Sequence, residues 1–206
     1  MTGRVEGFLK STTFSLVCFA VWIAIGIPRI RGLVHSFSWM ELVWVAYHSL
    51  IAILFLIRAR PSRVSLRPAH WLVALVTSFS GFFFLREPSS GMTANQVGDA
   101  IILVSIVGSG MAGLALWRSY DFLPALRGVS TGLVYRFVRH PMYVFSILNR
   151  LGYVIKHPGF FNTSIFLVLI GLYVLRAKFE EEIMRGDPLY VSYAERVRFR
   201  FLPGIY

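Results

Sequence analysis

The stretch Ala100–Trp117, AIILVSIVGSGMAGLALW, runs for 18 residues without an aspartate, glutamate, lysine or arginine. A helix of about 17–25 apolar residues spans the ~30 Å hydrocarbon core of a bilayer. Four further uncharged runs, and one interrupted only by Arg150, reach or approach that length: Ser11–Pro28, Leu42–Ile57, Pro68–Leu85, His157–Leu175 and Met142–Ile155. Backbone amides in lipid need internal partners, and no alternating barrel pattern is visible. The sequence therefore predicts an all-α membrane protein with about six transmembrane helices.

Lysine and arginine residues are distributed unevenly between the two sides that six alternating helices would create. With the N-terminus inside, 16 of the 21 basic residues fall on inner segments and four on outer segments. The positive-inside rule then predicts cytoplasmic N- and C-termini in a multi-pass protein, in the inner or plasma membrane if the source is bacterial. This distribution also explains the net charge of +11, so we expect no nucleic-acid partner. The lone Cys18 cannot build a zinc site, and we expect no metal.

Polar chemistry is concentrated in the second part of the chain. Residues 1–117 contain four hydrophobic helices with little polar chemistry, whereas residues 118–206 contain a polar loop, a shorter hydrophobic hairpin and a polar tail. The break Gly186-Asp187-Pro188 predicts that the last long helix ends near Arg185 and that a short helix follows, from Leu189 to about Val197. The segment Gly108–Gly113 fits G-x-G-x-x-G, but inside an apolar run it indicates close helix packing rather than nucleotide binding.

The segment Tyr135–Tyr143, YRFVRHPMY, carries the strongest local signal. Pro141 suits the first turn of a helix, where its missing N–H costs nothing. Arg139 and His140 would then lie just outside the helix, beside the positive end of its dipole and at the membrane surface. An interfacial anchor made of arginine and tyrosine accounts for the same segment, so this motif alone leaves two interpretations open.

Three other features add polar groups to this region. Arg150 lies in the middle of a hydrophobic run, which indicates a functional pocket or an internal ion pair, although a short run also lets its side chain snorkel. Glu180–Glu182 follow the last hydrophobic run and need nearby cations, or else form a solvated cluster. One face of the predicted tail helix gathers phenols and guanidiniums, and an amphipathic helix on anionic lipid has the same pattern: Tyr190, Tyr193, Arg196 and Arg200.

The second part of the chain resembles the isoprenylcysteine carboxyl methyltransferase family and its phospholipid methyltransferase relatives in the order of its motifs. These motifs are R-H-P-M-Y at residues 139–143, a hydrophobic hairpin, Glu180-Glu181, Tyr190, Tyr193, Arg196 and Phe201-Leu202-Pro203-Gly204. The resemblance covers about residues 115–206. It implies that residues 118–206 are a catalytic region that binds S-adenosylmethionine at the cytosolic face. The family often has glycine two residues after the tyrosine, where this chain has Phe145. We expect that difference to alter the pocket wall.

The resemblance also implies roles for individual residues. The residues implied to bind the cofactor are Tyr135, His140, Pro141, Tyr143, Glu180, Glu181 and Tyr193. Those implied to be catalytic are Arg139, Arg196 and Glu181, and those expected to bind the acceptor are Arg150, Arg196 and Arg200. Which of Arg196, Arg198 and Arg200 contacts the acceptor stays open, because their spacing to Pro203 differs among relatives.

The expected reaction transfers a methyl group to a small hydrophobic, lipid-like or isoprenoid acceptor, with membrane lipids as neighbours. A carboxylate acceptor needs no base, only guanidinium groups that hold it in line, whereas a thiol or amine needs a base such as His140 or a glutamate. Two alternatives remain. One is an NADPH-dependent membrane reductase of sterols or lipids, and the other is a non-catalytic protein that binds lipid.

Overall fold

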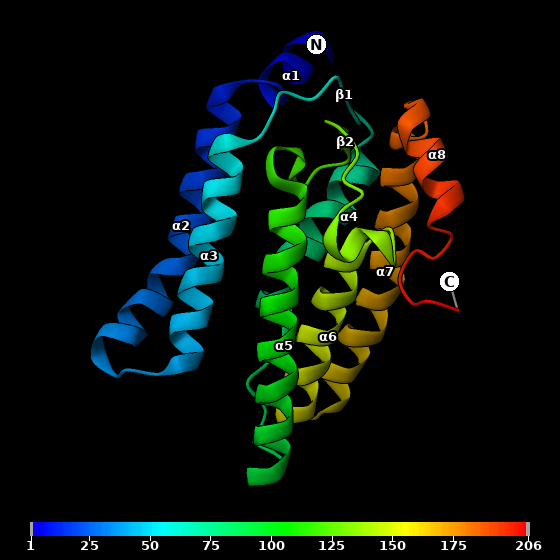
Figure 1. The fold of residues 1–206 in the computed structure, drawn as a ribbon. Helices are drawn as coiled ribbons and strands as arrows, with labels where there is room; N and C mark the ends of the chain where they lie inside the picture. The colour runs from blue at the N-terminus through cyan, green and yellow to red at the C-terminus, as the bar shows by residue number, and fades with distance from the viewer. Residues whose placement is uncertain (1, 205–206) are drawn as a thin grey trace.

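The computed structural model describes residues 2–204 and consists mainly of long helices packed side by side (Figure 1). The elements follow the order α1 (Thr2–Leu9), α2 (Thr12–His35), α3 (Trp39–Ile57), β1 (Arg63–Val64), α4 (Pro68–Ser78), the 3₁₀ helix η1 (Ser80–Phe83), α5 (Met92–Leu116), η2 (Trp117–Ser119), β2 (Ala125–Leu126), η3 (Leu133–Arg136), α6 (Pro141–Lys156), α7 (Phe160–Met184) and α8 (Pro188–Arg196). The prediction of an all-α membrane architecture is confirmed, apart from one two-residue β-ribbon.

Four described helices are long and apolar enough to cross a membrane, namely α2, α3, α5 with η2, and α7. The other two predicted spans also form helices, but shorter ones. Helix α4 has 11 residues and continues through η1 into extended chain, and α6 has 16 residues, or about 24 Å at ~1.5 Å per residue. The count of six spans therefore stays a prediction.

The two ends of the bundle differ in their connections. One end gathers α1, the β1–β2 ribbon and α8, while the α2–α3 turn and the loops before α5 and α7 lie at the other (Figure 1). At the first end, the Lys10 ammonium donates to the Ser62 carbonyl at 3.0 Å, and β1 pairs antiparallel with β2. At the opposite end, the Asn162 amide holds the Leu85 backbone through both its oxygen (2.9 Å) and its nitrogen (3.0 Å). The described N-terminal residues and tail thus share one end.

Small residues bring α5 and α6 into close contact. A β-carbon at Gly152 would stand 2.8 Å from the Gly98 carbonyl oxygen, and one at Gly108 would stand 2.3 Å from the Phe145 ring. The glycine-rich segment of α5 therefore packs against other helices, as predicted, and Phe145 is directed into that contact. Phe145 does not line the large cavity described below, so the expectation that it alters the pocket wall is wrong.

The region that carries the polar motifs folds as the local signals predict. Helix α6 begins at Pro141, α7 ends at Met184, and α8 follows the break at residues 186–188. The chain after α8 then runs beside the start of α6. Its carbonyl groups at Phe199 and Arg200 accept hydrogen bonds from the backbone amides of Arg139 and His140, both at 2.9 Å.

Candidate active site

His140 and Glu181 form the centre of a buried polar cluster between α6 and α7. The His140 Nε2 atom lies 3.2 Å from Oε1 of Glu181. His140 precedes the first turn of α6 because Pro141 starts that helix, and Glu181 lies in the last turns of α7. Tyr143, one turn into α6, places its ring parallel to the imidazole with the ring centres 5.4 Å apart. The predicted histidine–proline turn and acidic pair thus meet in space.

Two arginines make close contacts with Glu181, and a third, Arg185, places Nη2 4.0 Å from its Oε2. Arg139 Nη1 lies 3.1 Å from Oε1, and Arg200 donates from Nε and Nη2 to the two carboxylate oxygens at 3.0 Å each. Such a two-point guanidinium contact is among the stronger hydrogen-bonding arrangements in proteins. Glu181 is only 2% exposed. Its carboxylate is enclosed by these protein partners and does not line the cavity described below, so the catalytic and cofactor-binding roles expected for Glu181 stay predictions.

Glu180 differs from its neighbour because it faces the cavity. The Tyr143 hydroxyl donates to Oε1 of Glu180, and Arg176 Nε donates to the same oxygen at 3.4 Å. The second oxygen lies 3.9 Å from His140 Nδ1. Arg176 itself is buried, is anchored on Thr77 at 2.8 Å, and lies over the Tyr143 ring at 5.0 Å. Glu180 therefore keeps an oxygen without a close donor beside the cavity wall.

A cavity of about 930 Å³ adjoins this cluster. The predicted residues that line it are Tyr135, Arg139, His140, Tyr143, Arg150, Glu180 and Tyr193. The hydroxyl of Tyr190 and Nε of Arg139 lie buried at the same wall, and the Tyr190 side chain interacts with that of Arg139. Neither atom forms a hydrogen bond of good geometry in the described chain, so both are able to contact a ligand in the cavity.

Tyr135 and Tyr193 connect η3 to α8. The Tyr193 hydroxyl donates to the Tyr135 carbonyl oxygen at 2.6 Å, and both side chains are buried. Burial raises the pKa of Tyr193 to about 12 and raises the pKa of Tyr135 well above its usual value. Both phenols therefore stay protonated at neutral pH, which suits donors and structural contacts better than bases.

Arg150 lies deeper along α6, ten residues or about 15 Å of helix from His140. Its Nε donates to Ser80 Oγ at 3.1 Å and its Nη1 to Asn149 Oδ1 at 2.9 Å. No carboxylate of the described chain forms an ion pair with this half-buried guanidinium. Of the three interpretations left open for Arg150, the described chain shows no ion pair and places the residue at the cavity wall, while snorkelling to the membrane surface stays an untested prediction.

The remaining predicted residues lie outside the cavity wall. Pro141 is fully buried, and Arg200 donates to the carboxylate of Glu181. Both residues therefore contact the protein side of the polar cluster and do not line the cavity. Arg196 lies exposed at the end of α8 and makes no hydrogen bond or ion pair with any described residue. The structure therefore brings Arg200, not Arg196, to the cluster, because the irregular chain after Arg196 runs back along Arg139 and His140. A catalytic role for Arg196 stays an untested prediction.

Sequence reasoning did not assign Arg176 or Tyr190 to the site. Arg176 carried a signal, since three adjacent carboxylates need cations one turn away. Tyr190 shared a helical face with Tyr193, but only the structure shows that it is buried beside Arg139 at the cavity wall.

A comparison with protein families matches residues 97–187 to the family described as phospholipid methyltransferase. No curated protein matches the chain significantly. The matched segment begins in α5, includes all of α6 and α7, and ends at the residue before α8. It therefore contains His140, Tyr143, Glu180 and Glu181 but not the tail that closes over them. Over this segment, which forms the core of the candidate site, the chain is similar to the phospholipid methyltransferase family.

Proposed function

We propose that this protein transfers a methyl group from S-adenosylmethionine to a lipid-like carboxylate acceptor at the cytosolic face of the membrane. One observation carries the proposal. His140, Tyr143 and Glu180 converge on a large cavity, and all three lie inside the segment that matches a methyltransferase family. The cavity volume of about 930 Å³ lies at the upper end of the range for small-molecule sites, which leaves room for two ligands.

The residues at the cavity wall fit the functional groups of S-adenosylmethionine. Glu180 offers a carboxylate oxygen to an amino group or to ribose hydroxyls, and Tyr190 and Arg139 offer donors to a carboxylate. When bound, this cofactor supplies a methyl group already activated on a sulfonium. The protein's part is then mainly to align the two reactants and to exclude water. Glu181, held by Arg139, His140 and Arg200, keeps the cofactor-facing groups in place.

Arg150 is the residue that we propose to bind the methyl acceptor. A guanidinium without a carboxylate partner, half-buried within a predicted span, suits an anionic acceptor group. A carboxylate is nucleophilic as the anion and needs no base. The raised pKa values of Tyr135 and Tyr193 keep both phenols protonated, so neither residue would act as a base toward an acceptor. The end of the bundle that carries α8 holds most of the basic residues, which favours the cytosol as the side that it faces.

Isothermal titration calorimetry of the detergent-purified chain tests cofactor choice. We expect saturable binding of S-adenosylmethionine and none of NADPH. Binding of NADPH alone would favour the membrane reductase, and binding of neither would favour a non-catalytic protein.

A second experiment tests the acceptor. Membranes that contain the protein are incubated with S-adenosylmethionine labelled on the methyl group, and the organic extract is counted before and after mild alkali. A methyl ester releases labelled methanol under alkali, so we expect volatile counts. Counts that stay non-volatile would show methylation at nitrogen or sulfur and would contradict the carboxylate assignment while keeping the methyltransferase.

A further inference from the structure

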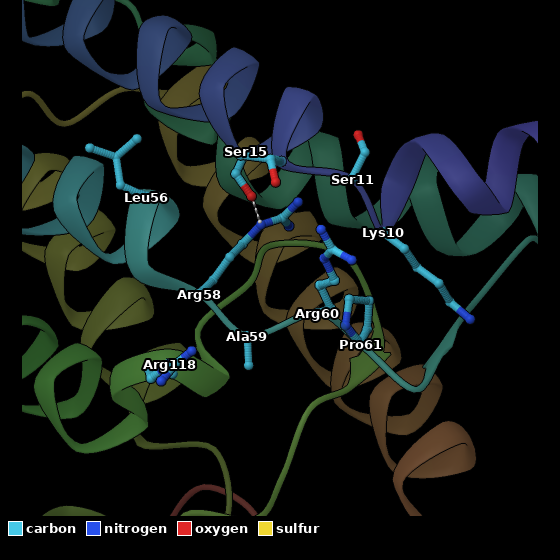
Figure 2. A pocket seen from close by; sticks show the side chains of 10 residues that line it. Lys10, Ser11, Ser15, Leu56, Arg58, Ala59, Arg60, Pro61 and Arg118 are labelled. Carbon is cyan, nitrogen blue, oxygen red and sulfur yellow. Dashed lines mark hydrogen bonds between the residues drawn. The ribbon is translucent and has the colours of Figure 1, made fainter.

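A second, separate pocket of about 300 Å³ lies near the start of α2, the end of α3 and η2 (Figure 2). None of its lining residues also lines the large cavity. Six of them carry the argument, four with basic side chains and two with hydroxyl groups: Lys10, Arg58, Arg60, Arg118, Ser11 and Thr12. No carboxylate of the described chain lines the pocket, although Lys10 pairs with Glu6 at 2.7 Å and Arg58 with Asp121 at 3.0 Å, so its positive charge comes mainly from Arg60 and Arg118.

Arg58 forms the back of this pocket and is held in place by protein contacts. Its side chain is 2% exposed and donates to Ser15 Oγ at 2.7 Å, to Asp121 at 3.0 Å and to the Leu9 carbonyl at 3.4 Å. A guanidinium has five N–H donors, so these contacts leave part of its capacity unused. Arg58 is therefore a fixed, buried cation rather than a mobile surface side chain.

The buried charges behind the pocket do not balance. Asp121 is shared by two buried guanidiniums, those of Arg58 and Arg127. Burial lowers the pKa of Arg127, and the neighbouring positive charge of Arg58 lowers it further. The negative charge of Asp121 raises the same pKa and offsets part of this effect. One carboxylate for two buried cations leaves an excess of positive charge, which is costly in a low-dielectric setting unless an anion approaches.

The front of the pocket adds cations that have no partner within the described chain. Arg60 and Arg118 are exposed, and the side chain of neither makes a hydrogen bond or an ion pair there. Arg58 and Arg60 both line this pocket, and Figure 2 draws their side chains in the same part of the view, whereas Lys10 extends away from them. Like charges in one pocket repel each other unless an anion offsets them.

Helix α2 contributes a further positive end. Ser11 is its N-cap and accepts a hydrogen bond from the Phe14 amide at 3.2 Å, so the amides of the first turn before Phe14 lack intrahelical partners. The dipole of this 24-residue helix places partial positive charge at Thr12, beside the pocket. The helix end and the arginines thus favour the same kind of ligand.

We infer that this pocket binds a phosphate-bearing anion, the headgroup of an anionic phospholipid. Guanidinium forks, a helix N-terminus and hydroxyl groups are the usual partners of phosphate oxygens. The pocket lies where α2 begins and α3 ends, and both helices qualify as membrane spans, so lipid headgroups are its natural neighbours. Free phosphate shares this chemistry, and the test separates the two sources.

The test is calorimetry of the full chain in dodecyl maltoside with dioctanoylphosphatidylglycerol, dioctanoylphosphatidylcholine and inorganic phosphate. The pocket variant is Arg60→Gln/Arg118→Gln, and the control Arg4→Gln/Lys178→Gln removes the same charge from exposed positions outside the pocket. Because the pocket variant removes two cations that can each donate charge-assisted hydrogen bonds to a phosphate, it should weaken phosphatidylglycerol binding by about tenfold or more. The control should change it less than about twofold, as expected for screened surface charges.

Each result bears on the inference. Preference for phosphatidylglycerol over phosphatidylcholine, lost only in the pocket variant, supports a lipid headgroup site. Binding of inorganic phosphate alone with the same loss supports a phosphate site with a soluble source. Equal weakening by both variants, equal affinity for both lipids, or no binding would overturn the inference. Melting temperature verifies folding, and if the double variant is unstable, Arg60→Gln alone should show a smaller loss in the same direction.

Discussion

His140 and Glu181, 41 residues apart in the chain, bring imidazole Nε2 and carboxylate Oε1 to 3.2 Å, and both side chains are buried. This contact joins the start of α6 to the end of α7 at one end of the bundle. Arg139 and Arg200 bind the same carboxylate, so the C-terminal tail is fixed to the site through Glu181. The contact therefore brings together the histidine–proline motif and the glutamate pair, which are separated in the chain by a hydrophobic hairpin.

Glu181→Gln should destabilise the protein strongly, because three basic partners lose their buried counter-charge. Removing one member of a buried ion pair typically costs about 3–5 kcal/mol. Thermal unfolding in detergent measures the effect as a lowered melting temperature. Glu182→Gln is the matched control, because Glu182 is half-exposed and pairs with the exposed Arg67, a contact of about 0–1 kcal/mol. Equal melting temperatures of the two variants would contradict the buried role of Glu181.

Tyr190→Phe should separate ligand binding from stability. In the described chain the hydroxyl interacts only weakly, with Arg139, so its removal should change the melting temperature little. The same change should weaken S-adenosylmethionine binding by several-fold in calorimetry. A large loss of stability with unchanged affinity would show that the hydroxyl serves the fold and not the ligand.

Tyr193→Phe should act in the opposite manner. It removes the hydrogen bond to the Tyr135 carbonyl, leaves a buried acceptor unsatisfied and should cost about 1–3 kcal/mol. Faster proteolysis of the tail relative to the rest of the chain should accompany the loss. Tyr153→Phe is the control, since its longer 3.3 Å hydrogen bond is solvent-exposed.

Gly108→Ala should destabilise the contact between α5 and α6, because its new β-carbon would stand 2.3 Å from the Phe145 ring. Phe145→Ala in the same chain should recover part of the loss by removing that ring. Gly171→Ala, in α7 with open space around it, should be neutral or stabilising by up to about 1 kcal/mol. Additive effects of Gly108→Ala and Phe145→Ala in thermal unfolding would rule out the contact.

Much of this arrangement follows from local sequence signals. Pro141 marks the start of α6, and Gly186-Asp187-Pro188 marks the break before α8, because proline restricts the backbone wherever it occurs. The convergence of His140 with Glu180 and Glu181 was predictable from the family resemblance, which supplies long-range information that periodicity lacks.

Other features depend on tertiary packing that the sequence does not display. Glu180 and Glu181 are adjacent carboxylates with similar local surroundings, and only the positions of α6 and the tail decide that one faces the cavity while the other is enclosed. Arg200 replaces Arg196 at the cluster because the chain after α8 pairs its backbone with residues 139–140. Hydropathy likewise could not show that α4 stops after 11 residues, since the buried Asn162 amide satisfies the extended chain beyond it.

The central claim is that Glu180, beside His140 and Tyr143, contacts S-adenosylmethionine. Calorimetry of the unmodified chain, Glu180→Gln and Glu182→Gln with S-adenosylmethionine tests it most directly. We predict that Glu180→Gln binds at least about tenfold more weakly, the loss expected for one charge-assisted hydrogen bond, while Glu182→Gln binds as the unmodified chain does. Equal affinity of all three proteins, or no binding by any of them, would contradict the account.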